Sequence, residues 1–241
     1  MRPLVWWLTG LPERSSNSVK YTHMSTAKKA PVGQSPEPAQ ASGTGSSISY
    51  SADHLANQFL IAMPGMVDPN FAGSVIYLFE HTERGAMGLV VNRPTEVDLE
   101  TLFDKIELKL EIAPYLNQPV YFGGPGQIER GFVLHEPISV GAYSSSLAVP
   151  GGLTMTTSKD VLEAVAAGNG PEKFLMTLGY AGWSAGQLED EIALNGWMNV
   201  PLSQDQMSEI IFDTPSAQRY ERTMSHLGFD PSHLSGEAGH A

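Results

Sequence analysis

Residues 178–192 read Leu-Gly-Tyr-Ala-Gly-Trp-Ser-Ala-Gly-Gln-Leu-Glu-Asp-Glu-Ile and constrain the fold more than any other stretch of the chain. They join an apolar strand to a glycine-rich turn and then to a helical pattern. Residues 182–186 form the pattern Gly-x-Ser-x-Gly, which is typical of a nucleophilic serine on a sharp turn between a strand and a helix. The segment therefore predicts a strand-to-helix junction and suggests a hydrolase as one hypothesis.

Ser184 has the chain order of a catalytic triad, because Asp213 and then His226 or His233 follow it. An α/β-hydrolase, however, needs a long parallel sheet around its nucleophile, and only about fifty residues remain after Ser184. The competing interpretation is a helix N-cap, since Gln187 completes the S-x-x-Q pattern of a capping box. We favour the N-cap, with a helix over residues 184–194, and keep a small-molecule hydrolase using Ser184 as the alternative.

The composition indicates one soluble globular domain. The chain has 241 residues, of which 41% are hydrophobic and 17% charged. Cys is absent, which excludes disulfides, thiolate metal sites and cysteine nucleophiles. No apolar run approaches the roughly 18 residues of a membrane-spanning helix. We expect a cytoplasmic protein that does not act on a membrane.

The first 56 residues differ from the rest of the chain. They are rich in Ser, Pro, Gly, Ala and Gln without sustained periodicity, which predicts a disordered extension. The apolar run 4–8 lacks the length and cleavage site of a signal peptide. Met24 begins a sequence that looks like a native start, so translation from Met24 is an alternative to Met1. The folded domain is expected over residues 57–229, with a disordered tail over 230–241.

The expected domain is strongly acidic. Residues 1–56 hold five of the 14 basic and three of the 26 acidic residues, which leaves nine and 23, a net charge near −14. Nonspecific nucleic-acid binding depends on neutralising phosphates with Lys and Arg. The charge therefore argues against direct nucleic-acid binding.

Hydrophobic periodicity predicts strands in pairs with single helices between them. The expected strands and extended segments are residues 58–63, 74–81, 87–92, 120–122, 131–135, 153–156, 174–178, 197–200 and 209–212. The expected helices are residues 98–110, 159–167, 184–194 and 214–226, with caps at Asp98, in residues 157–160 and at Thr214. This order favours a single α+β domain with a mixed or antiparallel sheet flanked by helices.

Other polar motifs have structural explanations beside their functional ones. His81 and His135 could share a metal only if their strands are adjacent, and no third ligand is evident, so no metal or cofactor is expected. The turn 123–126 could hold an anion near Arg130, but a plain turn between strands explains it equally well. The carboxylates at 189–191 suit the first turns of a helix, where they interact favourably with its dipole.

Four separated motifs, in the same order, resemble the YqgE/AlgH family of bacterial proteins. They are Ala-Met-Pro-Gly-Met-Val-Asp-Pro-Asn-Phe at 62–71, Glu-His at 80–81 with Gly-Ala-Met-Gly-Leu-Val-Val-Asn at 85–92, Gly-Gly-Pro at 123–125 with Arg-Gly-Phe-Val-Leu-His at 130–135, and Leu-Gly-Tyr-Ala-Gly-Trp at 178–183 with Gly-Gln-Leu-Glu at 186–189. The resemblance covers residues 57–229. Gly126 departs from the family, in which valine is usual.

The resemblance implies a single AlgH-like α+β domain in the cytosol. Family members are named as candidate transcriptional regulators, and no catalytic residues are established for them, so none is carried over. We expect a non-enzymatic regulatory or binding protein that acts indirectly, through an unknown protein or small-molecule partner. The hypothetical ligand-binding residues are Arg130, His135, Tyr180, Trp183, Ser184 and Gln187.

Overall fold

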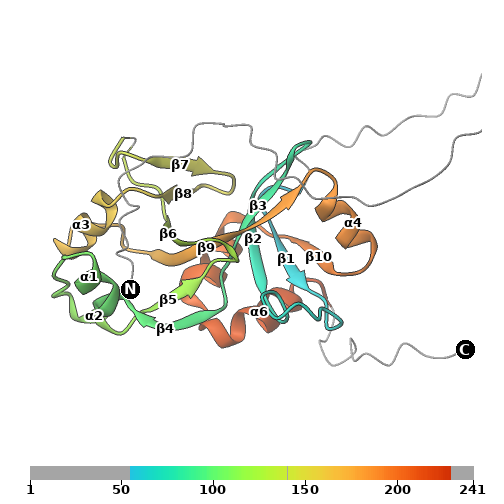
Figure 1. Cartoon of the computed structure of the whole chain (residues 1–241), viewed down its shortest axis with the longest axis horizontal. Coiled ribbons are helices and arrows are strands. Elements are labelled where there is room, and N and C mark those ends of the chain that lie inside the picture. The colour runs from blue at the N-terminus through green and yellow to red at the C-terminus, as the bar shows by residue number, and fades with distance from the viewer. Residues whose placement is uncertain (1–54, 140, 229–241) are drawn as a thin grey trace, which may run out of the picture. The chain divides into compact units, whose positions relative to one another are not determined.

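The computed structural model describes residues 55–139 and 141–228. The predicted disordered extension, apart from its last two residues, the predicted tail 230–241 and the alternative start at Met24 lie outside the described residues. Strands occupy the middle of the domain, with helices at its two ends and along one side (Figure 1). Within the described ranges, no helix is both long and apolar enough to span a membrane. The α+β prediction is confirmed.

Eight strands form one continuous, curled path in the order β10-β1-β2-β3-β9-β6-β8-β7, with β5 joining it at β9 and β4 pairing with β5. Their bounds are β1 Gln58–Ala62, β2 Val75–Thr82, β3 Gly85–Val90, β4 Pro94–Asp98, β5 Pro119–Phe122, β6 Gly126–His135, β7 Ser146–Val149, β8 Leu153–Thr156, β9 Phe174–Ser184 and β10 Trp197–Pro201. All pairings are antiparallel except β5 with β9. The sheet is therefore mixed.

Strand β9 joins the two halves of the sheet. Its first part pairs with β6 and β5, whereas its last four residues pair with β3. The sequence predicts a strand over 174–178 only, because the glycines that follow suggest a turn. The strand continues because its later residues pair with β3 and β6, and Gly179, at a φ of +77°, allows the close approach of the turn at Gly124. A Cβ on Gly179 would lie 2.3 Å from the carbonyl oxygen of Gly124.

Helices cover the ends and one side of the sheet. They are α1 Leu99–Lys105, α2 Ala113–Leu116, α3 Asp160–Ala166, α4 Gln187–Ala193, α5 Gln204–Ser208 and α6 Arg219–Ser225, with the π-helix η2 Glu209–Asp213 and the 3-10 turn η3 Ser216–Gln218. Three apolar clusters fill the interior: one under α5, η2 and α6, one between α1, α3 and the sheet, and one beneath α4. Helices α1 and α4 lie at opposite ends of the domain (Figure 1).

Several predicted helix bounds need correction. The predicted cap at Asp98 is confirmed, since its carboxylate accepts the N–H of Thr101 at 2.8 Å, but α1 ends at Lys105. Helix α3 begins at Asp160 without a side-chain cap, because Ser158 donates to the Asp160 carboxylate instead. Thr214 does not cap a helix, because its hydroxyl donates back to the carbonyl of Glu209.

The predicted extended segment 209–212 is wrong. These residues belong to η2, which continues directly from α5. The N–H of Thr214 bonds the carbonyl of Glu209, the i to i+5 connection of a π-helix, at 2.9 Å. A short apolar run does not distinguish a buried strand from a buried helical turn. Ile210 and Ile211 are fully buried, so tertiary packing fixes the conformation here.

Candidate functional site

The predicted residues Trp183, Ser184 and Gln187 lie together where β9 passes into α4. Both the backbone N–H and the hydroxyl of Ser184 donate to the Gln187 side-chain oxygen, each at 3.0 Å. The reciprocal bond from the Gln187 N–H is missing, and α4 starts at Gln187 with Gly186, in left-handed conformation, as its N-cap. The predicted capping box is therefore half formed, and the predicted helix start at 184 is wrong by three residues.

The possible partners of a nucleophilic Ser184 are bound elsewhere. Asp213 pairs with Lys173 at 2.8 Å, and His226 contacts the Gln206 amide at 3.2 Å. His233 lies outside the described residues. Among residues that the structure describes, no hydrogen bond joins Ser184 to a histidine. The geometry around Ser184 is that of an exposed turn which anchors a helix.

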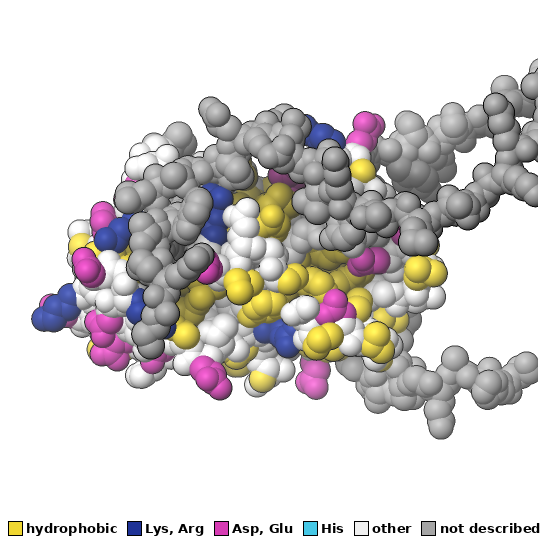
Figure 2. Space-filling view, viewed as in Figure 1, with side chains coloured by type: hydrophobic (Ala, Val, Ile, Leu, Met, Phe, Trp, Pro, Cys, Tyr) yellow, Lys and Arg dark blue, Asp and Glu magenta, His cyan; other side chains and the backbone are white. Residues whose placement is uncertain are grey.

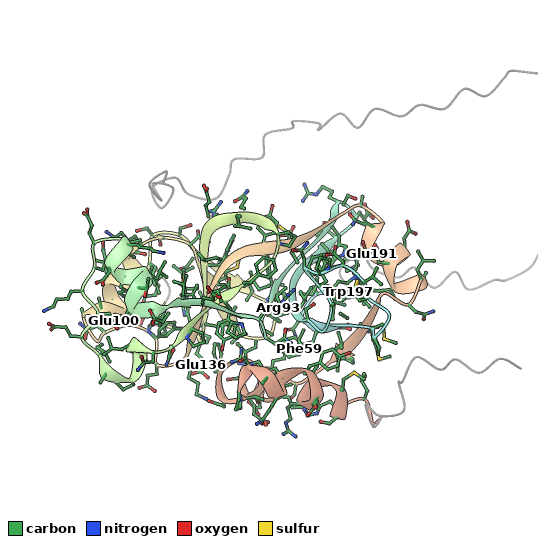
Figure 3. The ribbon with its side chains drawn as sticks, turned by 60° about the horizontal axis from the view of Figure 1, so that its bottom comes forward. Phe59, Arg93, Glu100, Glu136, Glu191 and Trp197 are labelled. Carbon is green, nitrogen blue, oxygen red and sulfur yellow. The ribbon has the colours of Figure 1, made fainter. Side chains whose placement is uncertain are left out.

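Trp183 belongs to a packed aromatic junction. Its ring is stacked against Phe71 and meets Trp197 edge to face, with centroids 5.7 Å apart in the second pair. The Glu191 carboxylate accepts the indole N–H of Trp183 at 2.9 Å and that of Trp197 at 2.7 Å. It also accepts the Gln187 amide at 2.9 Å. Figure 3 shows Glu191 and Trp197 side by side at the α4 end of the domain, and their contacts fix α4 to the sheet.

The neighbouring acidic residue Glu189 has a similar role. Its carboxylate lies 2.9 Å from Nε2 of His81, whose side chain is buried on β2. Asp190, between the two, is exposed. Two of the three carboxylates, those of Glu189 and Glu191, therefore bind residues of the sheet, whereas the sequence predicts contact with the helix dipole and solvent for all three.

His135 lies at the other end of β9. It pairs with Phe174 at the start of that strand, whereas Trp183 is near its end, roughly 30 Å away along an extended chain. The imidazole is buried and bonds the Glu136 carbonyl at 2.7 Å and the Thr156 hydroxyl at 2.9 Å. Burial lowers the pKa of His135, so the ring is kept neutral. It is a hydrogen-bonded core residue.

The two histidines proposed for a metal do not meet, because His81 lies in the β3 half of the sheet and His135 beside the start of β9. Across residues 55–139 and 141–228, no group of three or more His, Cys, Asp or Glu could hold a metal ion.

Arg130 and Tyr180 form a third group beside the glycine turn. The guanidinium lies 5.5 Å from the centroid of Phe132, whose ring meets Tyr180 edge to face. Burial lowers the pKa of Arg130. The turn itself packs on β9: a Cβ on Gly124 would lie 2.2 Å from the Tyr180 carbonyl carbon, and the Gly123 N–H donates to Leu178. Close packing and β pairing thus account for the glycines. The six predicted residues occupy three places and do not converge on one pocket.

A cleft of about 290 Å³ opens elsewhere, between α1, the start of β9, η2 and α6. The residues that line it are Leu99, Tyr115, Gln118, Pro119, Tyr121, Glu172, Lys173, Phe174, Leu175, Met176, Ile211, Phe212, Asp213 and Arg219. Glu136 accepts the Ser208 hydroxyl and lies 4.0 Å from Nζ of Lys173, which lines the cleft. The cleft combines aromatic walls with two basic and two acidic side chains.

Arg219 is the unusual group in this cleft, because its side chain is only 4% exposed. Its Nε donates to the Thr214 carbonyl at 2.8 Å and its Nη1 donates to the Val91 carbonyl. The guanidinium lies 5.0 Å from the Tyr121 ring centroid. Burial lowers the pKa of Arg219, and Tyr121 opposes that effect. In the described part of the chain, no ion pair joins Arg219 to a carboxylate.

The π-helix gives the cleft one of its walls. Ile211, Phe212 and Asp213 of η2 line it, and the carbonyl that follows the turn, at Thr214, binds Arg219. Single π turns within helices are frequent at functional sites. The motifs of the sequence do not single out this region, although one signal of it is present. On a helix over 214–226, Arg219 shares a face with Thr223, and both side chains are buried.

Comparison with known proteins identifies the family. The AlgH-like family model matches residues 59–232. A UPF0301 protein of Cupriavidus metallidurans is 66% identical over 188 residues, covering 78% of this chain and 96% of the relative. One of Burkholderia mallei is 62% identical over 196 residues, covering 80% of this chain and all of the relative.

Two solved structures share the fold. The solution structure of AlgH from Pseudomonas aeruginosa is 48% identical and superimposes with a TM-score of 0.61, covering 83% of this chain and 100% of that one. A crystal structure of a Corynebacterium diphtheriae protein, 19% identical, has a TM-score of 0.56 over 79% of this chain and 95% of that one, and supports the fold alone. The family predicted from the four motifs is thereby confirmed, and the chain belongs to the AlgH-like family.

Proposed function

We propose that this domain is a non-enzymatic regulatory module of the cytoplasm that binds a small molecule in the cleft beside Arg219. The observation that carries the proposal is a buried arginine, Arg219, that lines a preformed cleft and has no carboxylate partner among the described residues. Concave sites with aromatic walls and a few placed polar groups are the usual form of small-molecule sites. Ligand occupancy would then be sensed by a protein partner, which makes the regulation indirect.

The charge distribution supports a partner other than nucleic acid. The chain carries 14 basic and 26 acidic residues. On the face shown in Figure 2, the Lys and Arg side chains that are visible are scattered among acidic ones. In the cleft, Lys173 is paired with Asp213, and Arg219 is a single cation that is buried. These contacts do not form the row of unpaired Lys and Arg side chains that binds the phosphates of a nucleic acid.

The proposal is tested by NMR titration of the full chain with a panel of small aromatic acids, amines and neutral compounds. We expect binders to shift the backbone amide signals of Tyr121, Phe174, Ile211 and Phe212. Gln118→Trp fills the mouth of the cleft and should abolish those shifts. Glu129→Trp, which adds the same ring at an exposed position outside the cleft, should leave them unchanged. Binding confined to other surfaces, or unaffected by Gln118→Trp, would refute the proposal.

A further inference from the structure

The charge of Arg219 is compensated only in part within the protein. Two carbonyl oxygens accept N–H groups of its guanidinium, and the Tyr121 ring lies against it. Carbonyl dipoles and an aromatic ring reduce the cost of burying a cation, but they carry no negative charge. A guanidinium always keeps its proton in a protein, so the positive charge persists in this cleft. The guanidinium could therefore be neutralised by an anion that enters from solvent.

The acidic residue of the cleft that could have neutralised Arg219 is bound to another cation. Asp213 pairs with Lys173 at 2.8 Å, and Lys173 also lies 4.0 Å from Glu136. All three side chains are about half exposed, so this group is at the solvent edge. Arg219 is therefore the one buried cation among the residues that line the cleft.

The carboxylates at the edge limit the charge that a ligand can carry. Glu172 and Asp213 both line the cleft. A group with one negative charge can bind Arg219 and leave no excess charge facing them, whereas the second charge of a phosphate dianion would be repelled by both carboxylates. Charge complementarity therefore favours a monoanion.

The residues that line the cleft indicate the chemical nature of the uncharged part of the ligand. Tyr115 of α2, Phe174 of β9 and Phe212 of η2 are aromatic residues of the lining, and the Tyr115 and Phe174 rings meet edge to face with centroids 5.3 Å apart. A volume of about 290 Å³ accommodates a compact molecule of about the size of one aromatic ring with its substituents. These aromatic side chains favour a flat aromatic body over a polyhydroxylated one, and the polar groups that share the lining leave room for a charged substituent.

We infer that the cleft binds a small aromatic monocarboxylate, with its carboxylate on the guanidinium of Arg219 and its ring against the aromatic residues of the lining. The planar guanidinium is matched to a carboxylate, which accepts charge-assisted hydrogen bonds from its N–H groups. This inference rests on the proposed function, because it names the chemical class of the ligand for the same cleft.

The test compares three probes of similar size with the wild-type chain by NMR: benzoate, benzamide and phenyl phosphate. Benzoate should shift the amide signals of Tyr121, Ile211 and Phe212 with millimolar affinity. Benzamide, which lacks the charge, should bind at these residues about tenfold more weakly, and phenyl phosphate should also bind more weakly than benzoate. Arg219→Gln should reduce benzoate affinity to that of benzamide. Arg222→Gln, on the same helix but ion-paired to Glu209 outside the cleft, should bind benzoate like the wild type.

The outcomes separate this inference from the proposed function. If benzamide and benzoate bind the cleft with equal affinity, the ligand does not need a carboxylate and the inference fails, while the proposed small-molecule site stands. If phenyl phosphate binds more tightly than benzoate, the inference that the ligand is a monoanion fails. Failure of all three probes to shift cleft residues also overturns the inference, and the wider panel with Gln118→Trp then decides the proposed function. If Arg219→Gln does not fold, the comparison of benzoate with benzamide on the wild-type chain remains decisive.

Discussion

The indole N–H of Trp183 donates to the carboxylate of Glu191 at 2.9 Å, and this contact fixes helix α4 to the end of strand β9. The same carboxylate oxygen accepts the N–H of Trp197 at 2.7 Å. One acidic side chain thereby satisfies two buried indoles. The family-identifying segment is thus primarily a structural junction, and the cleft beside Arg219 is a separate feature of the domain.

Removal of this carboxylate should destabilise the fold. Glu191→Ala leaves the N–H groups of Trp183 and Trp197 without their acceptor, and each loss costs about 1–3 kcal/mol. We predict that the free energy of unfolding falls by about 2–4 kcal/mol, measured by urea denaturation followed by tryptophan fluorescence. The control Asp190→Ala changes an exposed neighbour and should stay within about 0.5 kcal/mol of wild type. Equal effects of the two substitutions would contradict the role of Glu191.

The glycine turn should tolerate no side chain where it meets β9. In Gly124→Ala the new Cβ would lie 2.2 Å from the Tyr180 carbonyl carbon, at a φ of +146°. We predict a loss of about 3 kcal/mol or more in thermal or urea unfolding, because backbone must move to relieve the overlap. Gly65→Ala, at a glycine with nothing within 4 Å, should change stability by less than about 0.5 kcal/mol. A mild effect of Gly124→Ala would show that the turn does not depend on this packing.

Stability should fall in mild acid because of His135. Burial lowers its pKa in the folded state below the ordinary value of 6.5, so the unfolded chain binds a proton more readily. The stability that neutral His135 contributes is fully present above about pH 6.5. It is lost as the pH falls from that value through the lower pKa of the folded state. His135→Gln has no titrating ring, so its unfolding free energy should decrease less than that of wild type over this range. If the unfolding free energies of the two proteins depend on pH in the same way, His135 is not the cause of the acid sensitivity.

Ser184 should be unreactive, because its hydroxyl donates to Gln187 and contacts no histidine among the described residues. A fluorophosphonate probe is expected to leave the chain unlabelled, and Ser184→Ala should lose no more than about 1 kcal/mol of stability. Stoichiometric labelling of the wild-type chain that disappears in Ser184→Ala would instead establish the hydrolase alternative.

Local patterns in the sequence predicted much of the sheet, because alternating and apolar runs such as those of β2 and β10 carry their own signal. They did not predict how β9 joins the two halves. Its glycines suggest a turn in isolation, and the pairing of this segment with β3 and β6, like the contact between Gly179 and the turn at Gly124, forms only in the folded domain. The π turn at Ile210 and Ile211 was missed for the same reason, since burial overrides a short ambiguous pattern.

The candidate site was less predictable than the fold. Ser184 and Gln187 are neighbours on the chain, so their contact could be predicted from their spacing. Arg219 gains its significance from Val91 and Tyr121, which lie about a hundred residues earlier, and from a cleft that forms only after the sheet has closed. No local spacing encodes such a site. A helical face shared with Thr223 was the one signal of its burial.

A crystal structure of the chain grown with benzoate tests the cleft beside Arg219 most directly. We predict that the benzoate ring lies between Phe174 and Phe212, with its carboxylate oxygens about 3 Å from the guanidinium nitrogens of Arg219. Benzoate bound only at other surfaces, or an Arg219 that instead pairs with Asp213, would contradict it.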